Sequence, residues 1–189
     1  MNFYKHYINI GSQSALASFA FFILLYILDV NPIGNYTILG IWIPIVFIVR
    51  GTRFYRDKLN DGLLTYWKGV SVGAIFSIFS ASLFTFLFYI FVKVIDMSIL
   101  DNHIIETQEA GQKYIEIFVK DEEIADLAYA QLVEEVSKID LISLTQSLFF
   151  SKLSGGIFIS LITSAFLRKT IILEPVNNQG STTENNEHE

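Results

Sequence analysis

Residues 69–92 read GVSVGAIFSIFSASLFTFLFYIFV, and this stretch is the clearest evidence for the fold. It contains no acidic or basic side chain, and Lys68 and Lys93 stand directly before and after it. An uninterrupted apolar run of more than about 18 residues is long enough to cross the hydrocarbon core of a bilayer as a helix. We therefore predict a transmembrane helix over residues 69–92.

Three other apolar stretches, residues 14–28, 33–49 and 148–167, are also expected to cross the membrane. The stretch 33–49 is only just long enough at a rise of about 1.5 Å per residue, and Pro44 is expected to kink it. The last stretch contains Lys152 near its outer end. We interpret Lys152 as a snorkelling lysine in preference to a buried functional ion.

A cleaved signal peptide is the alternative interpretation of the first stretch, because Lys5 precedes a short apolar segment. Leu28-Asp29-Val30 offers no pair of small residues for cleavage, and more spans follow. We therefore expect the first stretch to remain as a span.

The composition agrees with a membrane protein. Of 189 residues 52% are hydrophobic, including 17 Phe and 9 Tyr, which is too apolar for a small domain surrounded by water. Residues 96–140 hold 12 acidic residues against 3 lysines, a net charge of -9. The chain has no cysteine, which excludes disulfides, thiolate metal sites and cysteine nucleophiles. We predict an all-α, multi-pass membrane protein in which four transmembrane helices form an antiparallel bundle.

Basic residues predict the orientation. Most of them lie near the N-terminus, between the second and third spans, or directly after the fourth span, and the connection between the first two spans has none. Because cytoplasmic loops are enriched in Lys and Arg, both termini are expected in the cytoplasm. The residues that fix this topology are Arg50, Arg53, Arg56, Lys58, Lys68, Arg168 and Lys169. Binding of anionic lipid by this basic loop is the less favoured alternative.

The connecting segments have their own patterns. Asn60-Asp61-Gly62 predicts a turn between the second and third spans. The acidic segment, residues 94–140, is predicted to be a helical excursion outside the cell membrane, with an amphipathic helix over 122–136 and a weaker one before it, interrupted by Gly111. Residues 1–170 therefore form the membrane domain, and residues 171–189 are predicted to be a disordered cytoplasmic tail.

Small residues recur every four positions along the last two spans. The set is Gly69, Gly73, Ser77 and Ala81 in the third span, and Gly156, Ser160 and Ser164 in the fourth. Small side chains let helices approach closely within lipid, so both sets are predicted to be packing faces. A polar pathway lined by serines of the third span is the less favoured alternative.

Candidate chemistry is sparse. His103 and Glu106 could share a helix face as metal ligands, but His6 and His188 are predicted on the other side of the membrane. The carboxylates around Asp121 lack the spacing of a calcium loop. We expect no metal, no cofactor, no catalytic residues and no nucleic-acid partner.

Residues 51–73, GTRFYRDKLNDGLLTYWKGVSVG, resemble the segment after the second helix in a family of small bacterial four-helix membrane proteins, domain of unknown function number 4199, typical of Bacteroidota. The positions that carry the resemblance are Gly51, Tyr55, Arg56, Asp57, Gly62, Gly69 and Gly73. The similarity extends more loosely over residues 5–170. The resemblance implies a protein of the bacterial inner membrane and adds no site.

The sequence leaves two classes of function open. We expect a non-enzymatic membrane protein that acts through the lipid bilayer, a membrane-protein partner or a second copy of itself, with the acidic segment carrying the binding role. The alternative is a subunit of a transporter or channel. We place it second because, apart from Pro44 and the glycines, no ionisable or unwound element is expected near the middle of the membrane.

Overall fold

The computed structural model describes residues 3–170, so the predicted tail 171–189 lies outside the described residues. The described chain is all-α, which confirms the predicted fold class. Its elements are α1 (Phe3–Ile27), the 3-10 helix η1 (Asn35–Gly40), α2 (Trp42–Phe54), the π-helix η2 (Tyr55–Leu59), α3 (Tyr66–Val94), α4 (Ser98–Phe118), α5 (Glu122–Ser137) and α6 (Leu141–Leu167).

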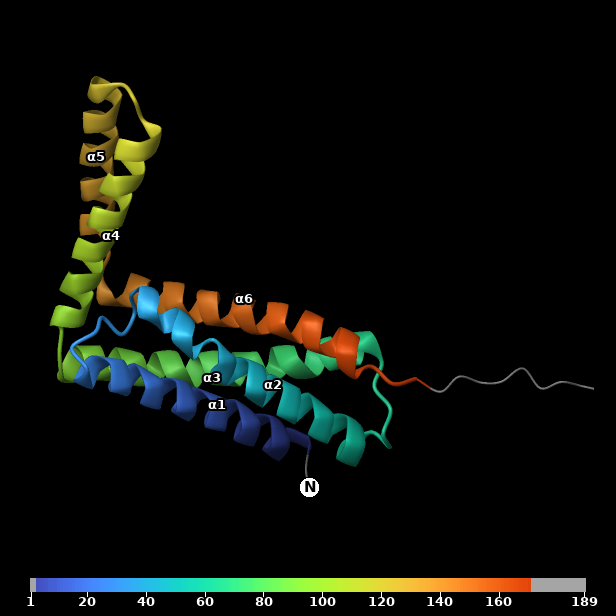
Figure 1. The fold of residues 1–189 in the computed structure, drawn as a ribbon. Helices are drawn as coiled ribbons and strands as arrows, with labels where there is room; N and C mark the ends of the chain where they lie inside the picture. The colour runs from blue at the N-terminus through green and yellow to red at the C-terminus, as the bar shows by residue number, and fades with distance from the viewer. Residues whose placement is uncertain (1–2, 171–189) are drawn as a thin grey trace, which may run out of the picture.

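Four helical stretches of residues 3–170 are long and apolar enough to cross a membrane: Lys5–Ile27, Tyr36–Leu59, Tyr66–Val94 and Leu141–Leu167. Figure 1 shows them side by side, with successive spans running in opposite directions. Each is longer than the apolar stretch seen in the sequence, because a helix continues through the polar residues that flank its apolar segment. The prediction of a multi-pass membrane protein is confirmed as four helical stretches of sufficient length and apolar composition.

The start of α6 shows why the apolar run in the sequence underestimates the length of the helix. Asp140 caps the helix: its carboxylate accepts a hydrogen bond of 2.8 Å from the Ser143 N–H, and the Ser143 hydroxyl accepts one of 3.0 Å from the Asp140 N–H. This capping box satisfies the free N–H groups of the first turn. The helix therefore begins at Leu141, seven residues before the predicted span at residues 148–167.

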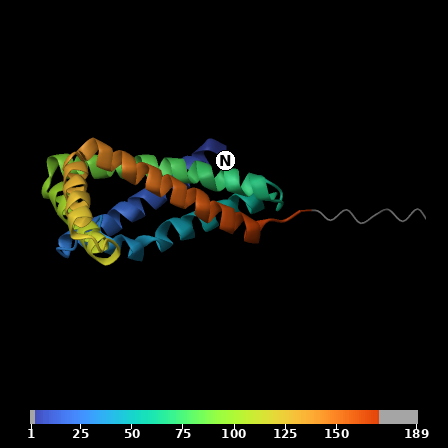
Figure 2. The ribbon, with the colours of Figure 1, turned by 90° about the horizontal axis from the view of Figure 1, so that it is seen from above.

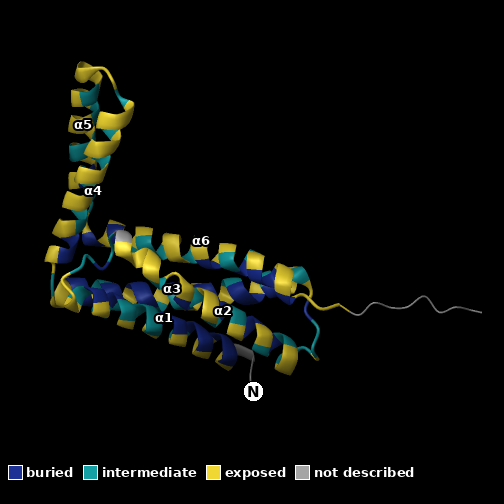
Figure 3. Ribbon diagram, viewed as in Figure 1, coloured by how far each residue is buried: buried dark blue, intermediate teal, exposed yellow. Residues whose placement is uncertain are grey.

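Helix α3 is the centre of the bundle and packs most extensively against α6 and then α1. Its buried phenylalanines belong to two apolar clusters, one toward each end of the spans. The cluster nearer α4 includes Phe22, Phe84, Phe88, Ile99 and Leu141, and the other includes Tyr7, Tyr55, Leu64, Phe76 and Leu167. Figure 3 shows the buried residues where the spans meet, and the outer faces of the helices exposed.

The turn between the second and third spans lies where the sequence predicted it. The helix ends at Leu59, and Asp61 and Gly62 follow with φ angles of 50° and 76°. Backbone hydrogen bonds of 2.8 Å in both directions join Leu64 to Lys169 and hold the end of α6 against this turn.

Helices α4 and α5 form an antiparallel hairpin that runs crosswise to the four spans (Figures 1 and 2). The predicted interruption at Gly111 is wrong, because α4 continues through it. Leu132 of α5 packs directly against Gly111, so the missing side chain serves as a contact point between the two helices. Asp121 begins α5 by accepting hydrogen bonds from the N–H groups of Glu123 and Ile124.

Candidate functional site

The seam between α3 and α6 brings the two sets of small residues together. The facing pairs are Gly69 with Ser164, Gly73 with Ser160 and Ser77 with Gly156. A Cβ atom on Gly69 would lie 2.7 Å from the Ser164 hydroxyl oxygen, which is too close for any side chain. The glycines therefore permit the short distance between the two helices.

Two serines of this seam bond within their own helices, whereas the buried hydroxyl of the third, Ser164, has no hydrogen-bond partner among the described residues. The Ser77 hydroxyl donates to the Gly73 carbonyl at 2.8 Å, and the Ser160 hydroxyl donates to the Gly156 carbonyl at 2.6 Å. Because these hydroxyls already have partners, the serines contribute mainly by being small. Ala81, the last member of the predicted α3 set, is also buried.

The register of this seam fixes the depth of Lys152. Each step of four residues along α3 is matched by a step of four back along α6, so one further step places Lys152 opposite Ala81. Ala81 is near the middle of the uncharged stretch 69–92. Lys152 therefore lies near the middle of the predicted bilayer, and not near the outer end of the span.

The predicted topology residues gather at the end of the bundle opposite the hairpin. Arg56 is half-buried there: its guanidinium pairs with Asp57 at 2.7 Å and donates to the Leu167 carbonyl at 3.3 Å. Lys68 donates to the Asn60 side chain at 2.8 Å. The remaining members are exposed on the same half of the bundle, namely Arg50, Arg53, Lys58, Arg168 and Lys169.

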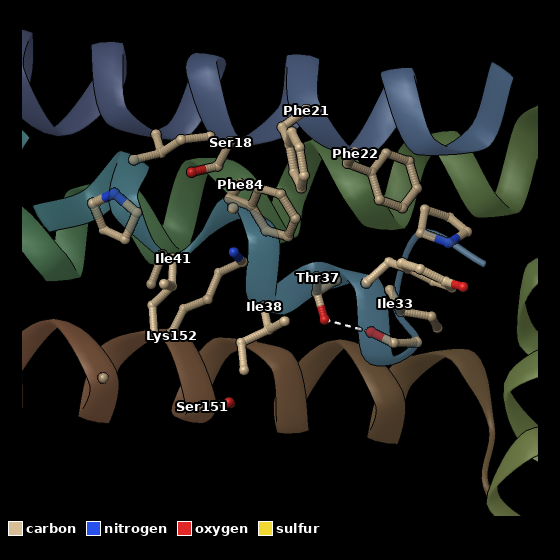
Figure 4. Close-up of a pocket in the computed structure, with 18 of the residues that line it drawn as sticks. Ser18, Phe21, Phe22, Ile33, Thr37, Ile38, Ile41, Phe84, Ser151 and Lys152 are labelled. Carbon is tan, nitrogen blue, oxygen red and sulfur yellow. Dashed lines mark hydrogen bonds between the residues drawn. The ribbon is translucent and has the colours of Figure 1, made fainter. Parts of the chain in front are cut away.

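A cavity of about 1300 Å³ opens among the spans on the hairpin side of the bundle. Side chains from α1, η1, α2, α3, α4 and α6 line it. Its walls are apolar for the most part, with Phe21, Phe22, Ile38 and Phe84 among them, and Lys152 enters from α6. Figure 4 shows the lysine reaching across the cavity from α6 toward Phe84.

Lys152 points into the open cavity and remains exposed there. Its Nζ atom lies 3.8 Å from the centre of the Phe84 ring, a cation–π distance. Residues 3–170 contain two ion pairs, Arg56 with Asp57 and Lys138 with Glu134, and neither involves Lys152. An intramembrane cation with an aromatic neighbour and no carboxylate partner leaves room for an anion from outside the chain.

Two further residues of the cavity wall carry a hydrogen-bond donor without a partner. The Ser14 hydroxyl is buried and has no hydrogen-bond partner within the described residues, and the same holds for the Asn31 side-chain amide nitrogen. Gly11 packs on Phe79 and Ser80 of α3, so Ser14, one turn further on, lies at about the depth of Lys152. A buried donor without a partner is costly, but both atoms are fully covered by protein, so they do not face the open space of the cavity.

The mouth of the cavity lies under the hairpin, and charged residues of α4 line it. His103, Glu106, Glu109 and Lys113 are among them, and the Glu106 carboxylate lies close to Gly34 in the loop between α1 and α2. Burial lowers the pKa of His103 below its usual 6.5, and the charge of Glu106 partly offsets this shift. His103 and Glu106 do share a face of α4, but residues 3–170 hold no cluster of three or more potential metal ligands.

The serines of α3 do not form the polar pathway considered from the sequence. Ser77 and Ser80 line the cavity, whereas Ser71 and Ser82 are exposed on other faces of the helix. The polar character of the cavity comes instead from several helices together. Sequence reasoning missed this because the contributing residues are distant in the chain and have no common spacing.

The second span is irregular where it borders the cavity. It begins as the 3-10 helix η1, turns at Ile41 and becomes α-helical from Trp42, with Pro44 in the first turn of α2. Proline is accommodated in the first turn of a helix because its missing N–H would have no partner there. Pro44 therefore lies at the start of α2, and in place of the kink predicted at Pro44 the span changes from 3-10 to α geometry at Ile41, whose φ of -62° and ψ of -26° are helical.

The comparison with known families gives one match. Residues 9–169 match the family described as Protein of unknown function (DUF4199). The chain belongs to this family. No curated protein and no solved structure matches the chain. Membership in DUF4199 assigns no activity, so the function must be argued from the cavity itself.

Proposed function

We propose that this DUF4199 protein binds an amphiphile with an anionic head group, and that Lys152 holds the head group inside the cavity. The observation that carries the proposal is the placement of the Lys152 ammonium near mid-depth, open to the cavity and without a carboxylate partner among residues 3–170. A cation in that position is costly unless an anion accompanies it.

The chemistry of the lining supports an anion with a long apolar part. The Lys152 ammonium offers N–H donors, which suit the oxygens of a carboxylate or phosphate. The surrounding Phe21, Phe22 and Ile38 suit a hydrocarbon chain. We propose a binding role without catalysis, with lipid as the partner and the bacterial inner membrane as the location.

Binding of a fatty acid to the purified full-length protein tests this proposal. Oleate should bind, and oleyl alcohol, which has the same chain without the charge, should bind more weakly. Lys152→Met should weaken oleate binding by about tenfold or more, because a hydrogen bond to a charged group contributes about 1.5–3 kcal/mol and about 1.4 kcal/mol corresponds to tenfold in affinity.

Lys93 provides a matched control. Its Nζ atom also lies over an aromatic ring, at 5.3 Å from the centre of Tyr89, but it is exposed at the end of α3. Lys93→Met should leave oleate binding unchanged. Equal binding of oleate by the wild type and Lys152→Met would contradict the proposal.

A transporter or channel subunit is the second candidate, and two observations favour it. Lys152 is an ionisable group near mid-depth, and the second span changes from 3-10 to α-helical geometry beside the cavity at Ile41. Discontinuous helices and charged residues at the midplane are features of secondary transporters. Saturable movement of an anionic solute into protein-containing vesicles, lost in Lys152→Met, would favour transport over binding alone.

The orientation remains our proposal and has the same basis as in the sequence. The basic residues at the end opposite the hairpin, Arg50, Arg53 and Lys58 among them, favour that end for the cytoplasm. The hairpin and the mouth of the cavity would then face the outside of the inner membrane.

A further inference from the structure

The hairpin of α4 and α5 is held close to the ends of the spans. Only residues 95–97 join α3 to α4, and only residues 138–140 join α5 to α6. Connections of three residues cannot carry the hairpin away from the bundle, because an extended chain spans at most about 3.3–3.6 Å per residue.

Contacts at the base fix the direction of the hairpin. Ile99 and Leu100 of α4 are buried in the same cluster as Leu141 and Leu144 of α6. The Asp96 carboxylate accepts hydrogen bonds from the Tyr26 hydroxyl at 3.0 Å and from the Ser98 N–H at 2.9 Å. The hairpin therefore keeps the crosswise direction seen in Figures 1 and 2. Because the spans cross the bilayer, a rod crosswise to them lies along the membrane surface.

One face of α4 lies toward the bundle from His103 to Lys113. His103, Glu106, Ala110 and Lys113 line the cavity below the helix and follow one another at steps of three or four residues. The next step along the same face reaches Ile117. The helix is about 31 Å long, and no residue of α4 after Lys113 lines the cavity, so its last turn extends beyond the cavity and faces lipid.

The last turn of α4, after Lys113, carries exposed apolar side chains. Ile117 is 69% exposed, Tyr114 63% and Phe118 65%, and the rings of Tyr114 and Phe118 are in contact with centroids 4.5 Å apart. On α5, Ile124 and Leu127 are exposed near the same tip. Away from this face, the exposed Gln112 side-chain amide donates a hydrogen bond of 3.0 Å to the Glu116 carboxylate.

We propose that the hairpin lies flat on the bilayer, with Tyr114, Ile117 and Phe118 inserted at the boundary between head groups and acyl chains. This surface continues the lipid-facing surface of the spans, and amphipathic helices bind such boundaries through an apolar face. The net charge of -9 over residues 96–140 opposes anionic lipid, so the head groups that the hairpin contacts are zwitterionic.

Spin labels on adjacent residues test the proposal in the full-length protein. The chain has no native cysteine, so Ile117→Cys and Glu116→Cys each give one labelling site. In phosphatidylcholine vesicles the label at position 117 should collide several-fold more with oxygen than with a water-soluble nickel complex, and the label at 116 should show the reverse. Tyr114→Cys is a second membrane-facing position if Ile117→Cys fails to fold.

Two results would overturn the proposal. Labels at 116 and 117 that both favour the nickel complex would show the hairpin surrounded by water. A label at 117 shielded from both reagents would show that protein, such as a second copy of the chain, covers this face. Neither result bears on oleate binding by Lys152, so the two proposals can fail separately.

Discussion

Adding a single methyl group to Gly73 should destabilise the bundle, because Gly73 packs against Ser160 with no space between the helices. A Cβ atom at Gly73 would lie 2.6 Å from the Ser160 Cβ atom and closer still to its hydroxyl oxygen. Ser160 cannot turn aside without loss, since it is buried and its hydroxyl donates to the Gly156 carbonyl. Overpacking of this kind costs about 1–3 kcal/mol.

Gly155→Ala is the control that isolates this contact. A Cβ atom at Gly155 meets nothing within 4 Å, and both glycines lie within helices. Replacing glycine by alanine within a helix stabilises it by about 0.5–1 kcal/mol in both variants, so the difference in stability between them is the steric cost. Gly73→Ala should therefore be about 1–3 kcal/mol less stable than Gly155→Ala.

The assay is reversible unfolding of the detergent-solubilised protein, followed by circular dichroism as denaturing detergent is added. Ser160→Gly, introduced into the Gly73→Ala protein, should recover stability because it removes the side chain that the new methyl group meets. Equal stability of Gly73→Ala and Gly155→Ala would contradict this steric explanation and mean that α3 and α6 lie further apart.

Three other predictions concern the cap of α6, the hairpin and the orientation. Asp140→Ala removes the cap of α6 and should cost about 0.5–2 kcal/mol in the same unfolding assay, unlike Asp101→Ala on the exposed side of α4. Because burial lowers the pKa of His103 in the folded protein, the unfolded chain binds a proton to this residue more readily. The free energy of unfolding should therefore decrease as the pH drops below about 6.5. His103→Gln should remove this decrease between about pH 7.5 and about pH 5.5, and an unchanged decrease would exclude His103 as its source. With the basic end in the cytoplasm, a cysteine at Asn60 should resist a membrane-impermeant thiol reagent in intact cells and one at Gln112 should react, and the reverse pattern would invert the orientation.

The spans and the central turn could be predicted because their signals are local. Uninterrupted apolar residues define residues 69–92, and Asn60-Asp61-Gly62 can adopt the positive φ angles that the turn needs. The small residues of α3 and α6 can be recognised from their spacing, but the sequence does not say that Gly73 meets Ser160. That pairing depends on the register between helices about 90 residues apart in the chain.

The cavity could not be predicted, because no local pattern encodes it. The sequence draws attention to Lys152 but suggests the wrong depth, since the apolar run that marks the span begins only at residue 148. The Asp140 capping box with Ser143 is a sequence signal that places the start at Leu141 and Lys152 twelve residues into the helix. Ser14 and Asn31 carry no signal, since single polar residues near a span are common.

Reversing the charge at position 152 is the sharpest test of the proposal that Lys152 selects an anionic head group. The purified wild type should bind oleate in preference to oleylamine, and Lys152→Glu should bind oleylamine in preference to oleate, because the remaining cavity is unchanged. If Lys152→Glu keeps the preference of the wild type for oleate, the head group does not meet Lys152 and the proposed function is wrong.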